Sequence, residues 1–176
     1  QSLADQDNQN RQYVAAEREE LLSFYDTLGA CTDLIIDITG NSGGSEQYWQ
    51  ELLVAPLIDQ PLSCMNYALL ADSDNNRPYI DDAFAPEMLH PIADLPELPA
   101  LNQEGLAAAT HYVESPLSVE PAAERSPFHG RVWVLVGEQV YSASESFAVF
   151  CKETGFATLV GSQTGGDGIG ALDPIF

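Results

Sequence analysis

One serine in the segment Tyr141–Ala148 has the surroundings that a nucleophile needs. The segment reads Tyr-Ser-Ala-Ser-Glu-Ser-Phe-Ala, follows the apolar run Val132–Val136 and opens a stretch with apolar residues at helical spacing. A strand that turns into a helix places Ser142 at the helix N-terminus, where free backbone N–H groups and the helix dipole favour negative charge. A serine there can attack a carbonyl carbon and find backbone donors for the oxyanion that forms.

The same residues also fit a purely structural role. Ser142 and Glu145 have the spacing of a capping box, in which both side chains bind backbone N–H groups at a helix start. On these residues alone a cap is the commoner meaning, and a cap needs no chemistry. Both interpretations stay open at this point.

A second turn with chemical potential follows the apolar segment Leu34–Ile38. Small residues lead from this segment to Gly43 and Gly44, after which a helical pattern begins. Paired glycines permit positive φ angles and let a ligand approach the main chain closely. Such a turn is often only a strand-to-helix connection, but it also aims backbone N–H groups well at a reacting carbonyl oxygen.

Three segments, taken in order, resemble the C-terminal-processing (tail-specific) serine peptidases, whose relatives include the tricorn core protease. Asp37–Gly44 is similar to their D-x-R-x-N-x-G-G turn, and Tyr141–Ala148 to their S-A-S-E nucleophile segment. Ala157–Gly166 is similar to the A-x-x-V-G-x-x-T-x-G stretch that follows. The resemblance covers roughly residues 10–54 and 128–176.

The resemblance implies an α/β fold, the ClpP/crotonase-like spiral of βαβ units, incomplete at both ends. It implies a serine endopeptidase that hydrolyses peptide bonds through an acyl-enzyme on Ser142. The oxyanion hole would consist of the N–H of Ala143 and one N–H from Gly43 or Gly44. Peptides or unfolded proteins are the implied substrates, no cofactor or metal is expected, and the family points to the cell envelope or secretion.

The chain departs from the family pattern where a catalytic base is expected. Thr39 stands in place of the usual arginine, and Asp167 occupies the lysine position of T-x-G-K-G. The single lysine, Lys152, follows Ser142 by ten residues, which is about 15 Å along a helix. No Ser/Lys dyad is therefore expected within this chain. The glycines on both sides of Asp167 predict a loosely held turn.

The tricorn-like branch uses an upstream histidine and a downstream glutamate instead. His90, His111 and His129 match no family position, and each is expected to be an ordinary surface or satisfied residue. Because the chain starts at Gln1 without a methionine and stops within an apparent strand at Phe176, we expect an internal piece of a longer protein. Two alternatives are compatible with the sequence. Either residues outside this piece supply the base, or the protein is a non-catalytic binding module that lost its base.

Composition narrows the possible partners. Six basic and 27 acidic residues give a net charge of −21, which argues against nucleic acid or an anionic membrane. No apolar run is long enough to span a bilayer. Cys31, Cys64 and Cys151 lack metal-ligand spacing, and the first and last of these are expected to be small core residues.

The predicted elements alternate between helices and strands, which favours a parallel sheet in an α/β layer. Apolar residues at helical spacing predict a core helix that ends at Gly29; they are Val14, Leu21, Leu22, Tyr25 and Leu28. A second helix is predicted over Ser45–Leu53, with Trp49 in the core.

We expect residues 1–176 to form a single peptidase-like core domain. Within it, residues 55–129 hold ten of the eleven prolines and are predicted to be a long irregular insertion. One strand is expected there, at Tyr67–Ala71, followed by a turn at Asp72–Asn76.

Overall fold

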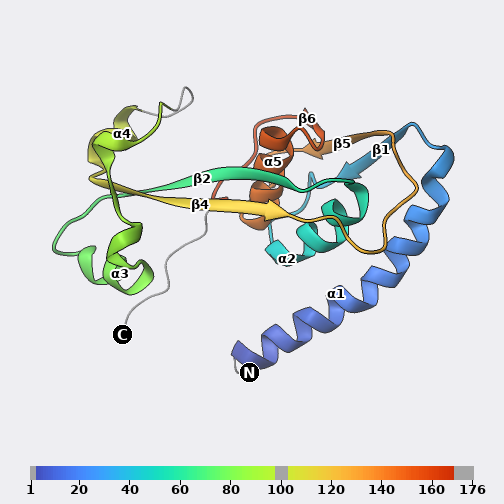
Figure 1. Ribbon diagram of the computed structural model, residues 1–176, viewed down its shortest axis with the longest axis horizontal. Coiled ribbons are helices and arrows are strands. Elements are labelled where there is room, and N and C mark those ends of the chain that lie inside the picture. Colours follow the sequence, from blue (N-terminus) through green and yellow to red (C-terminus); the bar gives the residue numbers. More distant parts are fainter. Residues whose placement is uncertain (1–2, 98–102, 169–176) are drawn as a thin grey trace. The chain divides into compact units, whose positions relative to one another are not determined.

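The computed structural model describes residues 3–97 and 103–168. The chain divides into two compact units (Figure 1). The first contains the residues up to Cys64 together with Ser118–Gly170, and the second contains Met65–Leu117. Each unit is described by itself below. The expectation of a single domain over residues 1–176 stays a prediction.

A parallel sheet of three strands forms the centre of the first unit. Its strands are β1 (Asp33–Asp37), β5 (Arg131–Val136) and β6 (Thr158–Gly161), in the order β1-β5-β6. In the register of the sheet, Leu34 lies opposite Val132, and Val134 lies between Ile36 and Leu159. The parallel pairing with helices between the strands confirms the predicted α/β class.

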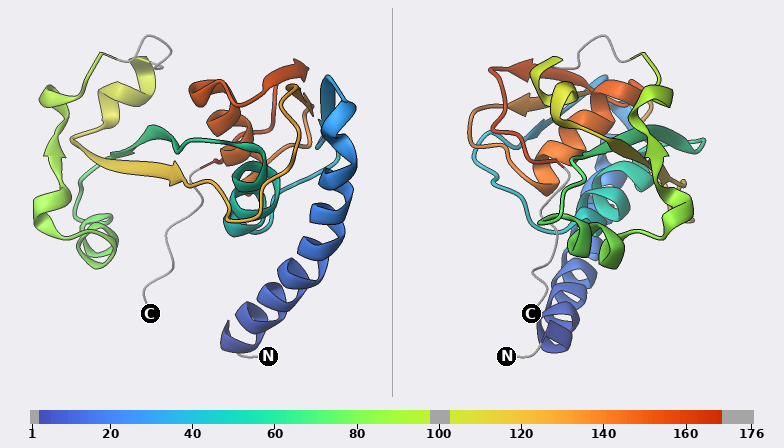
Figure 2. Two further views of the ribbon diagram at one scale, coloured as in Figure 1. Left: turned by 45° about the vertical axis from the view of Figure 1, so that its right-hand side comes forward. Right: turned by 90° about the vertical axis from the view of Figure 1, so that its left-hand side faces the viewer.

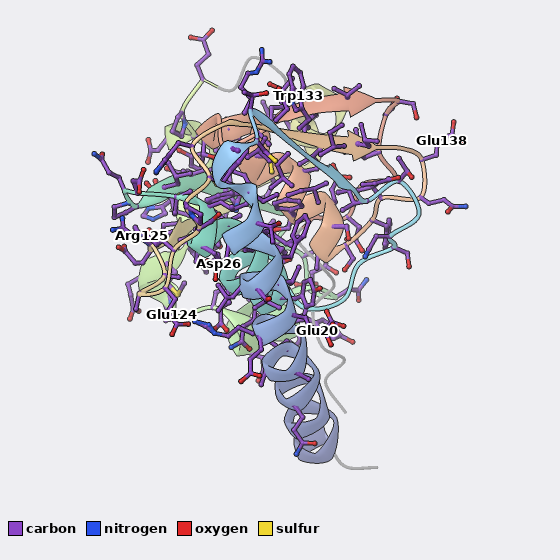
Figure 3. The ribbon with its side chains drawn as sticks, turned by 90° about the vertical axis from the view of Figure 1, so that its right-hand side faces the viewer. Glu20, Asp26, Glu124, Arg125, Trp133 and Glu138 are labelled. Atoms are coloured by element: carbon purple, nitrogen blue, oxygen red, sulfur yellow. The ribbon has the colours of Figure 1, made fainter. Side chains whose placement is uncertain are left out.

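The two faces of this sheet differ in burial. Alternate residues of β5 are buried on one face, namely Val132, Val134 and Val136. On the other face Ile35 is 63% exposed and Val160 is 45% exposed, while Trp133 (labelled in Figure 3) and Leu135 between them are half-buried. Parallel sheets are normally covered on both faces, so this open apolar face is unusual.

Helix α5 (Ala143–Thr154) covers the buried face of the sheet (Figure 1). Its apolar stripe, Phe147, Ala148, Phe150 and Cys151, is almost completely buried, which explains why this segment is a helix on a core. The helix ends at Gly155, whose φ of 72° gives the left-handed conformation of a C-terminal cap.

A second helical segment packs against α5 (Figure 2). It consists of α2 (Glu46–Tyr48), one π-helical turn at Trp49–Val54 and a short 3₁₀ turn at Ala55–Leu57. The Trp49 ring lies 5.1 Å from that of Phe150 and is 3% exposed, as predicted for a core residue. The predicted helix over residues 45–53 is therefore confirmed, with a π-helical turn that the pattern did not indicate.

The first unit begins with helix α1 (Leu3–Asp26), which continues into a 3₁₀ turn at Thr27–Ala30. Val14, Tyr25 and Leu28 of the predicted stripe are buried, and the Tyr25 hydroxyl donates to the carbonyl of Leu52 at 2.8 Å. The predicted cap at Gly29 is wrong because the chain tightens into the 3₁₀ turn without a left-handed residue.

The two cysteines predicted to lie in the core differ from each other. Cys151 is fully buried in α5, which raises the pKa of its thiol, whereas Cys31 is exposed in the connection before β1. The prediction for Cys31 is wrong because the connection between the two apolar elements runs over the surface.

The second unit is more regular than predicted. It contains α3 (Arg77–Ala83), β3 (His90–Pro91), α4 (Gln103–Ala108) and most of β2 (Leu62–Leu70) and β4 (His111–Val119). These strands form a sheet in the order β2-β4-β3, with β3 and β4 antiparallel. Short 3₁₀ turns lie at Pro86–Met88 and Ile92–Asp94.

The predicted strand at residues 67–71 corresponds to the end of β2, and the turn before α3 is also present. Within residues 3–97 and 103–168, no helix has both the length and the apolar character that a bilayer crossing requires.

Candidate active site

Ser142 lies at the N-terminus of α5, directly after β5 and a short turn. Its backbone has φ 55° and ψ −126°, a conformation that residues other than glycine rarely adopt. Strain of this kind costs about 1–3 kcal/mol and concentrates at functional sites. Sharp strand-to-helix turns with a strained serine are one way in which hydrolases expose a nucleophilic hydroxyl.

The capping-box interpretation of this segment is wrong. Ser142 makes no side-chain bond to the helix N-terminus. The Glu145 carboxylate instead accepts the Thr164 hydroxyl at 2.9 Å and the N–H of Gly166 at 3.2 Å. The serine hydroxyl therefore has no structural task among the described residues, and the glutamate binds a segment 19 residues further along the chain.

The glycine turn lies directly against Ser142. A Cβ atom on Gly43 would come within 2.7 Å of the Cβ of Ser142 and 2.9 Å of the carbonyl oxygen of Tyr141. The φ of Gly43 is 114°, so both space and backbone geometry require glycine. Two turns separated by about a hundred residues in sequence thus meet at the serine, as the resemblance implied.

The backbone N–H groups around Ser142 are not equivalent. That of Gly43 donates to the Asn41 side-chain oxygen at 2.9 Å and is already engaged. Those of Gly44 and Ala143 have no partner within the part of the chain that the structure describes. If an oxyanion hole forms here, Gly44 and Ala143 are its available donors.

Asn41 is a site residue that the sequence reasoning missed. Its side-chain oxygen accepts the N–H of Gly43 and, at 2.6 Å, the hydroxyl of Ser144 on α5. One oxygen thereby connects the glycine turn to helix α5. The bond from Asn41 to Gly43 is an Asx turn, for which an asparagine two residues before a glycine is a recognisable signal.

The loop that contains Asp167 is closely held, so the expectation of a loose turn is wrong. The N–H of Gly165 donates to the carbonyl of Val140 at 2.7 Å, and the N–H of Ser142 donates to the carbonyl of Gly166 at 3.1 Å. Asp167 itself has a φ of 60° and hydrogen-bonds to the hydroxyl of Tyr141, which raises the pKa of that tyrosine.

Neither Lys152 nor His129 lies close to Ser142. Lys152 is exposed in the last turn of α5, on the same helix as Ser142 and ten residues away, as predicted. His129 precedes β5 and lies 3.7 Å from Asp59, so the whole strand, about 20 Å long, separates it from the serine.

His90 and His111 belong to the second unit. The ring of His90 lies 5.1 Å from that of Tyr112, and Nδ1 of His111 is 3.0 Å from the Thr110 hydroxyl. These contacts lie within the second unit, whereas Ser142 belongs to the first.

Thr39, which replaces the family arginine, closes the turn after β1. Its N–H and its hydroxyl both donate to the Asp37 carboxylate, at 2.9 and 2.7 Å, and lower the pKa of that carboxyl. The turn is therefore stabilised locally by hydrogen bonds that need no arginine.

A pocket of about 380 Å³ adjoins the two turns. The pocket is lined by Gly43, Gly44 and Ala143 beside the serine and by apolar side chains from α1, the α2 segment and α5. Among residues 3–97 and 103–168, no three His, Cys, Asp or Glu side chains gather in a way that would hold a metal ion.

Comparison with known proteins identifies the family. Residues 8–172 match the model of peptidase family S41. A comparison with curated protein sequences finds no match.

Solved structures with a similar fold include mature CPAF complexed with lactacystin, at 21% identity and a TM-score of 0.54 over 85% of this chain and 34% of that one. A candidate peptidase from Parabacteroides merdae ATCC 43184 has 18% identity and a TM-score of 0.52, over 85% of this chain and 36% of that one. The chain thus spans about a third of the length of these structures. Membership of the tricorn-like branch stays a prediction. Since the family model covers nearly the whole chain, the chain belongs to peptidase family S41, a family of serine peptidases with an α/β core.

Proposed function

We propose that the full-length protein is a serine endopeptidase and that Ser142 is its nucleophile. The observation that carries the proposal is the backbone of Ser142, strained at φ 55° and pressed against Gly43, with its hydroxyl free of structural bonds among the described residues. A cap or a core serine would not need this strain. The free N–H groups of Gly44 and Ala143 beside it support the same role.

In the proposed reaction the Ser142 hydroxyl oxygen attacks the carbonyl carbon of the scissile peptide bond, and its proton passes to a general base. The carbonyl oxygen becomes an oxyanion, and the N–H groups of Gly44 and Ala143 stabilise it by a few kcal/mol. Collapse breaks the C–N bond, the amine leaves with a proton, and an ester to Ser142 remains. Water then attacks the ester, and the carboxylic acid product leaves.

The base in this proposal comes from residues other than Lys152 and His129. A helix and a strand, respectively, separate these two side chains from the serine. Serine without a base is a weak nucleophile at neutral pH, so the first step depends on that additional group.

A second candidate function is a binding module on the same fold. Asp167 at the family's lysine position favours it, because an aspartate hydrogen-bonded to Tyr141 does not replace an amine base. Such a module would keep the pocket and the strained serine but would not form an ester.

A fluorophosphonate probe separates the two functions. Full-length protein is treated with the probe beside Ser142→Ala and, as a control, Ser162→Ala, which removes an exposed serine after β6. We expect labelling of the parent and of Ser162→Ala and none of Ser142→Ala. Absence of labelling in folded parent protein, checked by circular dichroism, would favour the binding module.

A further inference from the structure

The pocket beside Ser142 has an acidic group in an otherwise largely apolar lining. Ile38, Trp49 and Phe147 form its almost fully buried apolar floor and Leu53 is half-buried, while the exposed Glu17 side chain from α1 also lines the pocket. Since Gly44 and Ala143 belong to the same lining, a carbonyl held by their N–H groups would place its own residue's side chain at this pocket.

The charge of Glu17 is not neutralised by its neighbour. Its carboxylate accepts the hydroxyl of Tyr48 at 2.5 Å. Burial, together with this carboxylate, raises the pKa of Tyr48 to about 12, so the tyrosine is a neutral donor at physiological pH. None of the described residues that line the pocket is a lysine, arginine or histidine, so the pocket holds a net negative charge.

We propose that this pocket selects a cationic side chain, lysine or arginine, at the residue whose carbonyl Ser142 attacks. The methylene stem would lie along the half-buried side chains of Leu53 and Tyr48. The ammonium or guanidinium group would bind the Glu17 carboxylate. The net charge of −21 favours the approach of the same substrates over a longer range.

That the cationic side chain belongs to the residue whose carbonyl Ser142 attacks rests on the proposed function. The preference of the pocket for a positive charge does not. It can be measured with n-butylammonium as a probe of the pocket and n-butanol as its neutral counterpart. The full-length protein carries Ser142→Ala to exclude chemistry, and isothermal titration calorimetry measures the binding of each probe.

We expect saturable binding of n-butylammonium that Glu17→Gln weakens at least tenfold, with n-butanol affected less than twofold. Glutamine keeps an oxygen that accepts the Tyr48 hydroxyl, so the variant removes the charge and little else. The matched control is Glu20→Gln, which makes the same change of net charge on an exposed residue of α1 outside the pocket (labelled in Figure 3). Equal weakening by both variants, or unchanged binding in Glu17→Gln, would overturn the proposal.

The consequence for catalysis is tested with two phosphonate probes that differ only in side chain, lysine against its near-isostere norleucine. We expect the lysine probe to label Ser142 at least tenfold faster in the parent and this ratio to approach one in Glu17→Gln. A norleucine preference in the parent would contradict the proposal. Failure of both probes to label would count against the nucleophile, while the binding of n-butylammonium would still decide the charge preference.

Discussion

Ser142 holds a backbone conformation that glycine adopts far more readily. The strain at φ 55° is compatible with function because the hydroxyl must project from a tight turn. Active sites commonly retain such strain at the expense of stability.

We therefore expect Ser142→Gly to be more stable than Ser142→Ala by about 1 kcal/mol, although both lack the hydroxyl. Alanine keeps the steric conflict at positive φ, whereas glycine relieves it and loses part of that gain to its greater freedom in the unfolded chain. Urea denaturation of both variants measures the difference. A more stable alanine variant would mean that the turn is not strained.

Gly43 and Gly44 offer a matched pair of substitutions. Both have positive φ, 114° and 144°, but only at Gly43 would a new Cβ collide with Ser142 and Tyr141. We expect Gly43→Ala to cost about 1–3 kcal/mol more than Gly44→Ala, because the two turns must move apart. Chemical denaturation gives the energies, and equal costs would show that the close approach carries no penalty.

Asp33 provides a prediction for pH. It accepts hydrogen bonds from Trp133, Thr32 and Arg131, which lower the pKa of its carboxyl to about 2. Since this pKa is below the value of about 3.9 in an unfolded chain, the stabilisation is complete above about pH 4 and is lost as the pH falls through about 2.

The difference in unfolding free energy between the parent and Asp33→Asn should accordingly be constant at pH 5–7 and shrink between about pH 4 and 2. Urea denaturation across this range measures it, and NMR titration of the carboxyl carbon gives the pKa directly. A difference that stays constant down to pH 2 would exclude the shifted carboxyl as its cause.

Sequence reasoning singled out residues that belong to short, recognisable motifs. Ser142 and Gly43 stand in short motifs, and the structure brings these motifs together. Asn41 and Glu145 were missed or misassigned because their partners, Ser144 and Thr164, are distant in sequence. A capping box is a local pattern, and here Glu145 binds Thr164 and Gly166, which are distant in sequence, so the local cap does not form.

At the level of elements, Glu145 connects helix α5 to the loop that follows β6. It binds this loop through Thr164 and Gly166, and the carbonyl of Gly166 in turn accepts the N–H of Ser142. These hydrogen bonds therefore fix the first turn of α5 and the loop to each other on both sides of Ser142.

Thr164→Val removes the hydroxyl donor while keeping the shape of the side chain. We expect a loss of about 1–2 kcal/mol in unfolding free energy, because the acceptor is a partly buried carboxylate. A double-mutant cycle with Glu145→Gln should show a coupling of about 0.5–1.5 kcal/mol. Additive effects of the two substitutions would show that this hydrogen bond contributes nothing.

Periodicity located most elements of the first unit because α1, the α2 segment and α5 each bury one apolar face. It did not indicate the π-helical turn at Trp49–Val54, whose first residue packs against Phe150 of α5. In the second unit, prolines and acids suggested irregular chain, yet β2 and β4 are hydrogen-bonded neighbours in one sheet. Strands paired at long range leave a weak local signal.

For the whole molecule, charge is the dominant property. Four acids labelled in Figure 3 are exposed: Glu20 and Asp26 on α1, Glu124 before β5 and Glu138 after it. With a net charge of −21, mutual repulsion opposes the folded state and salt screens it.

We expect the Tm at pH 7 to rise by about 3 °C when NaCl increases from about 50 to 500 mM, which corresponds to roughly 1 kcal/mol for a chain of this size. Scanning calorimetry measures the shift, with equal osmolarity of sucrose as the control. A Tm that falls with salt would mean that the ion pairs contribute more than the repulsion.

The open face of the parallel sheet has a practical consequence for handling the protein. Ile35 and Val160 present an apolar surface in the native state, with Trp133 and Leu135 between them. Dyes such as ANS report exposed apolar surface and are commonly used to detect molten globules. A correctly folded preparation of these 176 residues should therefore bind ANS and be mistaken for a molten globule, so near-UV circular dichroism is the safer criterion of native packing.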